Sequence, residues 1–101
     1  MKLRQLAHGR SGDKGDILNI SVIAHDLRDF SRLRQMVTAE RVKAQLGDRV
    51  LGEVQRYELP GLGALNFVLH RALDGGVTRS LVLDVHGKCL SSCLLDMEIE
   101  G

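Results

Sequence analysis

The chain has few aromatic residues, almost no charge imbalance and no basic stretch. Of its 101 residues only Phe30, Tyr57 and Phe67 are aromatic, so the core must be built from aliphatic side chains. A single-strand nucleic-acid binder needs aromatic stacking platforms and a basic excess. The net charge of +1, from 14 basic and 13 acidic residues, therefore argues against a nucleic-acid partner.

Membrane spans and secretion signals are also missing. No apolar run of the sequence approaches the ~20 residues of a spanning helix. The opening residues, 1–5, lack the apolar segment of a secretion signal. We therefore expect a cytoplasmic protein with no membrane partner. The two cysteines, Cys89 and Cys93, are too few for a zinc site, and we expect reduced core thiols.

One stretch concentrates the polar chemistry of this single domain. It reads His8-Gly9-Arg10-Ser11-Gly12-Asp13-Lys14-Gly15-Asp16. A turn needs one or two glycines, whereas this stretch has three, at 9, 12 and 15. The spacing predicts a longer loop whose backbone amides approach a ligand closely.

Two interpretations of this loop need no reaction. In an anion site, free glycine amides bind the ligand and Arg10 and Lys14 supply positive charge. The stretch is not a Walker loop, because no Ser or Thr follows Lys14. In a purely structural hairpin, the polar side chains would satisfy the loop's own backbone.

Two further interpretations involve metal or catalysis. A metal site would use the oxygens of Asp13, Asp16 and Asn19, but their spacing is not that of an EF-hand. We therefore predict no metal and no cofactor. A catalytic site would give His8 or Asp13 the general acid/base role.

The remaining residues show strand and helix patterns. We predict strands over residues 2–7, 17–24, 50–59, 80–85 and 89–99. On the 17–24 strand, Asn19 and Ser21 share one face and Asn19 points towards the loop's ligand. Residues 26–47 predict two helices, because the apolar stripe breaks near Thr38, a suitable N-cap, and Gly47 provides a C-cap.

Residues 62–73 show a helical stripe of Leu62, Leu65, Leu69 and Ala72 at spacings of three and four. Such a helix would place Asn66 in its first turn. That residue would face a site at the helix N-terminus or belong, with His70, to a structural flank. Phe67 would lie opposite the stripe, exposed, either unpartnered or in contact with another subunit.

Together these elements predict an α+β fold. We expect a two-layer sandwich with one mixed sheet and helices on one face, the other face being solvated or paired with a partner. A domain of this size has a small stability margin, which self-association would increase. We therefore expect a homo-oligomer.

Three separated motifs resemble the small C-terminal domain of acyclic terpene utilisation protein A (AtuA). They lie at residues 8–20, 58–67 and 75–81, and residues 86–99 resemble the close of that domain. The resemblance implies a ferredoxin-like fold and a setting in the breakdown of terpenoid or branched acids as coenzyme A thioesters. Longer family members carry a large N-terminal domain, so the resemblance implies a separately encoded large AtuA-like subunit as partner.

We therefore expect an accessory binding domain for a small anionic ligand, a carboxylate or an acyl-coenzyme A. The predicted ligand-binding residues are Arg10, Ser11, Gly12, Asp13, Lys14, Gly15, Asp16, Asn19 and Asn66. One alternative is a small stand-alone enzyme that uses His8 and Asp13 as acid and base. Another is a purely structural oligomerisation module.

Overall fold

A computed structural model describes residues 1–14, 17–72 and 90–100. The predicted strand over 80–85 therefore lies outside the described residues, as does Cys89. Cys93 is described, and it is a half-buried free thiol packed against the core.

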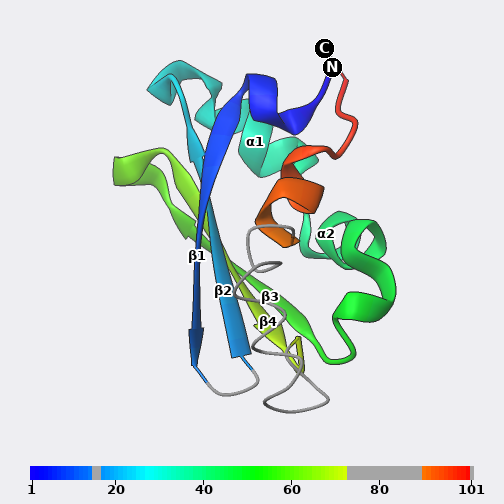
Figure 1. The fold of residues 1–101 in the computed structure, drawn as a ribbon. Helices are drawn as coiled ribbons and strands as arrows, with labels where there is room; N and C mark the ends of the chain where they lie inside the picture. The colour runs from blue at the N-terminus through cyan, green and yellow to red at the C-terminus, as the bar shows by residue number, and fades with distance from the viewer. Residues whose placement is uncertain (15–16, 73–89, 101) are drawn as a thin grey trace.

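A four-stranded sheet forms one layer (Figure 1). Its strands, in the order β1-β2-β4-β3, are β1 (Ala7–Lys14), β2 (Ile17–Ala24), β4 (Ala64–His70) and β3 (Val54–Leu59). The β1–β2 pair and the β3–β4 pair meet where β2 pairs with β4. All three described pairs are antiparallel, whereas the sequence predicted a mixed sheet.

The second layer is helical and lies on one face of the sheet (Figure 1). It contains α1 (Phe30–Met36), α2 (Ala39–Leu46) and a short helix over residues 90–95. Short 3-10 turns complete the described structure: η1 (Leu3–Gln5), η2 (Leu27–Asp29), η3 (Gly47–Arg49) and η4 (Pro60–Leu62). The predicted α+β architecture, with helices on one face, is confirmed.

The break between α1 and α2 is where the sequence predicts it. The Thr38 hydroxyl accepts a hydrogen bond of 3.1 Å from the Arg41 amide, which caps the first turn of α2. Gly47 follows α2 with a φ of 60°, a conformation that favours glycine. The Arg56 guanidinium on β3 donates to the carbonyls of Arg34 and Val37 at 2.6 and 3.0 Å. These bonds satisfy the C-terminal end of α1 and tie it to the sheet.

The core lies between the sheet and the helices. Along β2, and along β4 from Leu65 onward, every second residue is buried, because successive side chains of a strand point to opposite faces. Leu65, Phe67 and Leu69 supply the buried side of β4, and each has 0% exposed surface. Leu33 of α1 and Val42 of α2 are equally buried against them.

Residues 62–73 are therefore not a helix, and that prediction is wrong. Their apolar residues fit a period of two as well as a helical spacing, and the strand period buries Phe67 with Leu65 and Leu69. Phe67 lies in the core, so the predicted exposed contact with another subunit is also wrong. Residues 90–95 are helical instead of continuing the predicted strand over 89–99.

The N-terminal part of the predicted loop is also a strand. Residues 7–14 pair with β2 along their whole length, as the edge strand β1. The predicted strand over 2–7 is instead the η1 turn, which buries Leu3 and leads to the buried Leu6. Gly9 lets the 90–95 helix approach β1, since a Cβ there would lie 2.7 Å from the Ser91 hydroxyl.

The two ends of the described chain lie side by side (Figure 1). The Ile99 amide donates to the Met1 carbonyl at 2.8 Å, and the Leu3 amide donates to the Met97 carbonyl at 2.9 Å. These bonds hold the buried side chains of Leu3, Met97 and Ile99 under the end of the helical layer.

We predict that Gly52→Ala destabilises the domain by about 1–3 kcal/mol, because a Cβ at this position would lie 2.6 Å from the His70 carbonyl oxygen. That oxygen already accepts the Gly52 amide at 2.9 Å, so the backbone cannot retreat without breaking the pair. The matched control is Gly61→Ala, where no atom of the described structure lies within 4 Å of the added Cβ. Chemical denaturation measures both, and equal stabilities of the two variants would contradict this packing account.

Candidate functional site

The face of the sheet opposite the helices is the candidate site. No described helix packs on it, and we call it the open face (Figure 1). Strand alternation assigns it every second residue of each strand. The described side chains on the central part of this face are half-buried or exposed. They are His8, Arg10, Ile17, Asn19, Ser21, Ile23, Gln55, Tyr57, Leu59, Asn66, Val68 and His70.

The strand register aligns a polar row across all four strands. Arg10 of β1 pairs with Ser21 of β2, Ser21 pairs with Asn66 of β4, and Asn66 pairs with Tyr57 of β3. Neighbouring strands lie about 4.8 Å apart, so the row spans about 14 Å. We call these four residues the polar row. Arg10 and Asn66 are more than fifty positions apart in the sequence, and the sheet brings them onto one line.

Hydrogen bonds order the middle of this face. The Asn66 side-chain amide donates to the Ser21 hydroxyl at 2.9 Å. Beside it, His70 Nε2 donates to Gln55 Oε1 at 2.9 Å. Both bonds are between side chains on neighbouring strands, so they fix side-chain directions as well as register.

Two polar side chains on the β1–β2 half of the face have no such hydrogen bond within the described structure. Within the described residues, neither the Arg10 guanidinium nor the Asn19 amide makes a side-chain hydrogen bond or ion pair. Other arginines of the chain are tied to a carboxylate or a carbonyl, among them Arg4, Arg28, Arg41 and Arg56. Arg10 is thus an exposed cation with its donors turned to solvent, next to an ordered amide and hydroxyl.

The charge on the open face is mainly positive. Among its described side chains Arg10 is the permanent cation. Among its described side chains the nearest carboxylate is Glu53, which leads into β3 at the far end, where its carbonyl accepts the His70 amide at 2.9 Å. The face therefore favours an anion near Arg10.

The two proposed acid/base residues lie apart. His8 pairs with Ile23 and Asp13 with Leu18, at opposite ends of β1. Five strand residues span about 17 Å, so His8 and Asp13 do not act on the same atom. The exposed ring of His8 instead stacks on His25, with ring centroids 5.4 Å apart. His25 Nε2 donates to the Arg4 carbonyl at 3.1 Å, which fixes the position of that ring.

The other predicted ligand-binding residues divide between the two faces. Ser11 pairs with Ile20, whose side chain is buried under the helices, so Ser11 is on the opposite side from Arg10. Lys14 is described through its backbone pairing with Ile17. Gly15 and Asp16 lie outside the described residues.

Asn66 lies on the open face as a residue of strand β4, whereas the sequence predicted it at the start of a helix. It is not in a helical first turn, and the predicted helix N-terminal site does not exist, because residues 64–70 form β4. The strand pattern of residues 17–24 predicts Asn19 and Ser21 on one face, and the structure confirms it. No sequence pattern predicts Tyr57 and Gln55 beside them, because their place on the open face depends on the pairing of β3 with β4.

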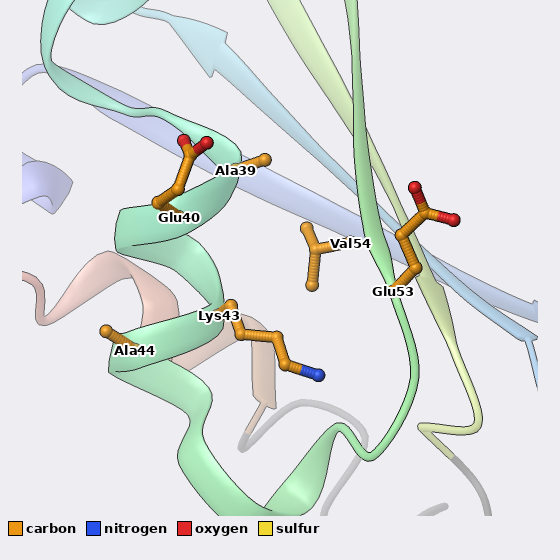
Figure 2. A pocket seen from close by; sticks show the side chains of 6 residues that line it. All are labelled: Ala39, Glu40, Lys43, Ala44, Glu53 and Val54. Carbon is orange, nitrogen blue, oxygen red and sulfur yellow. The ribbon is translucent and has the colours of Figure 1, made fainter.

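A groove lies between α2 and β3 and is a second place where a ligand could bind (Figure 2). It has a volume of about 430 Å³ and is lined by Ala39, Glu40, Lys43, Ala44, Glu53 and Val54. Its lysine is already engaged, because Lys43 Nζ donates to the Val50 carbonyl at 3.1 Å and also to that of Gly52. Glu40 is a carboxylate on the α2 side, while Figure 2 shows the Glu53 side chain directed away from α2. The groove thus offers an anionic ligand no cation that is free of backbone partners, unlike the open face.

The clearest charged contact near β2 has a structural role. Arg28 donates to the Asp26 carboxylate at 2.8 Å and holds the pKa of Asp26 at about 2. The same carboxylate accepts the Arg28 amide at 2.9 Å, which starts η2 after the end of β2.

In the described part of the chain, no group of three or more metal-binding side chains gathers. Among the described helices, none has the length and apolar character that a membrane span requires.

The chain is thus a small α+β domain of the ferredoxin-like class. The open face of its sheet is polar and is not covered by the described helices. The chain matches the family model of the AtuA ferredoxin-like domain over residues 1–100 and belongs to that family. The resemblance stated from the sequence motifs is thereby confirmed. Comparisons with curated proteins and with solved structures gave no match.

We predict that Asn66→Ala lowers the free energy of unfolding by about 1 kcal/mol, because it removes the bond to Ser21. The double variant with Ser21→Ala should cost less than the sum of the two single changes, since the bond is lost only once. Urea denaturation of the four proteins gives the coupling energy. Strict additivity would contradict a stabilising Asn66–Ser21 bond.

Proposed function

We propose that this domain is an accessory binding module of an AtuA-like system. Its open face contributes the polar row to a site for a small anionic ligand, a carboxylate or an acyl-coenzyme A. Arg10 meets the negative charge, and Asn66 and Ser21 provide ordered polar contacts beside it. Asn19 lies on the same face, one strand from Arg10.

The observation that carries the proposal is Arg10, which has no partner among the described residues and lies at the end of an ordered row. A guanidinium presents a planar fork of donors that matches two acceptor oxygens. Several other described arginines are paired internally, as Arg28 is with Asp26. An exposed arginine is ordinary by itself, but this one adjoins Ser21 and Asn66, which are held in place.

The geometry supports binding better than stand-alone catalysis. An acid/base pair must reach the same reacting group, and the separation of His8 and Asp13 along β1 prevents that. His8 alone remains as a candidate for proton transfer, next to the ring of His25. An enzyme acting on an acyl-coenzyme A through both residues is therefore the weaker alternative.

A structural oligomerisation module is the second alternative. The open face offers Ile17, Ile23, Val68 and Leu59 as apolar contacts for a second copy of the chain. Face-to-face pairing of two copies would also bury Arg10, and the described open face has no carboxylate near its centre to receive it. Burying an unpaired guanidinium is costly, so this surface suits an anionic partner better than a second copy.

The metabolic setting is part of the proposal, and the family resemblance supports it. AtuA-like proteins take their name from acyclic terpene utilisation, so the ligand we propose belongs to the breakdown of terpenoid or branched acids. We also propose a separately encoded large AtuA-like subunit as the partner that completes the site. A sheet face that supplies one side of a pocket would need such a partner to close it.

We predict that a short branched acyl-coenzyme A, or the free branched acid, binds the purified chain and that Arg10→Ala weakens binding about tenfold or more. A charge-assisted hydrogen bond contributes about 1.5–3 kcal/mol, which corresponds to at least that factor. Calorimetric titration measures the affinity. The melting temperature of the variant should stay close to that of the parent, because the Arg10 side chain makes no hydrogen bond or ion pair with the described residues.

The matched control is Arg49→Ala. Arg49 is also exposed, lies in η3 and, within the described structure, has no hydrogen bond or ion pair to lose. It changes the net charge by the same amount, so equal weakening by both variants would show non-specific attraction instead of a site at Arg10. Absence of binding by the chain, both alone and with the large subunit added, would overturn the proposal.

A further inference from the structure

Gly12 is a glycine that the described part of the fold does not require. A Cβ built on it meets no atom of the described residues within 4 Å. Its φ is not in the left-handed region, since the positive-φ glycines of the described chain are Gly47 and Gly63. Neither packing nor backbone conformation therefore explains a glycine in the interior of β1.

The other described glycines of interest each have a structural reason. Gly9 admits the 90–95 helix, and Gly52 lies against the His70 carbonyl. Gly63 has a φ of 63°, and its added Cβ would collide with Leu27. Glycine within a strand lowers stability relative to alanine, and it often marks a site where a ligand or another backbone approaches closely.

The position of Gly12 relates it to the polar row. It lies two residues after Arg10 on β1, and it pairs with Asn19 on β2. All three therefore belong to the open face, with neighbouring positions about 5–7 Å apart. Because Gly12 has no side chain, its backbone is uncovered between Arg10 and Asn19. Neither the Arg10 guanidinium nor the Asn19 amide has a partner in the described structure.

We propose that Gly12 is a specificity-determining residue whose bare backbone is the floor for a carboxylate lying flat between Arg10 and Asn19. This inference rests on the proposed function and assigns its ligand class. The guanidinium fork takes both oxygens of a carboxylate, and the Asn19 amide donates to one of them. A carboxylate is planar and can lie flat on the backbone, whereas the oxygens of a tetrahedral phosphate cannot all lie in one plane.

The free acid is accordingly the ligand, in preference to its coenzyme A thioester. Thioester formation removes the carboxylate charge, and it leaves phosphates as the anionic groups of the ester. The two sources of negative charge can thus be separated with two probes. One is 3-methylbutanoate, a short branched carboxylate, and the other is coenzyme A without an acyl group.

The test compares Gly12→Ala and Gly12→Val with the parent chain and with Gly61→Ala, a second open glycine remote from Arg10. Nuclear magnetic resonance titration gives the dissociation constant for each probe, and calorimetry gives the melting temperature. We expect Gly12→Ala to melt at or above the parent temperature. It should bind 3-methylbutanoate at least fivefold more weakly, and Gly12→Val should bind it more weakly still, while Gly61→Ala binds as the parent does.

The outcomes separate this inference from the proposed function. If Arg10→Ala loses the carboxylate while Gly12→Ala and Gly12→Val retain it, the role of Gly12 is wrong and the binding proposal stands. A marked fall in the melting temperature of Gly12→Ala would also overturn the inference, because the glycine would then be structural. If the parent binds coenzyme A and not 3-methylbutanoate, the ligand class is wrong. If the parent chain binds neither probe, both alone and with the large subunit added, both proposals fail.

Discussion

The antiparallel register between β2 and β4 is the constraint on which the rest of the structure depends. Because strand side chains alternate, this pairing puts Ile20 and Phe67 together on one side and Ser21 and Asn66 on the other. The first pair anchors the core against α1 and α2. A slip of one residue would exchange the two sides, burying Asn66 and exposing Phe67. Fold and candidate site are therefore fixed by the same pairing.

The two outer strands use that register differently. β3 carries Arg56 on the helical side, where its guanidinium binds the end of α1, and Tyr57 on the open face. β1 carries Gly9 on the helical side, where the 90–95 helix approaches, and Arg10 and Gly12 on the open face. In both strands one side builds the fold, and the other side is available for binding.

The sequence predicted the parts that local chemistry decides. The β2 strand, the Thr38 cap, the Gly47 end of α2 and the family all follow from adjacent residues or motifs. Residues 62–73 could not be assigned in this way, because Leu65 and Leu69 fit both a helical and a strand spacing. What decides between them is the pairing of β4 with β2 and β3, a long-range contact. Tyr57 could not be predicted as part of the candidate site for the same reason, since its place depends on strand pairing. Strand pairing also makes the first part of the glycine-rich stretch an edge strand, although its glycines have the pattern of a loop.

An anion bound on the open face at Arg10 would change the amide chemical shifts of the surrounding strand residues. To map these changes, the chain is titrated with the free branched acid while the backbone amides are observed. We expect the largest shifts on β1 and β2 around Arg10, Gly12 and Asn19, with smaller ones at Asn66. Shifts concentrated at Lys43 and Val54 would instead place the ligand in the groove between α2 and β3, and binding at Arg10 would be wrong.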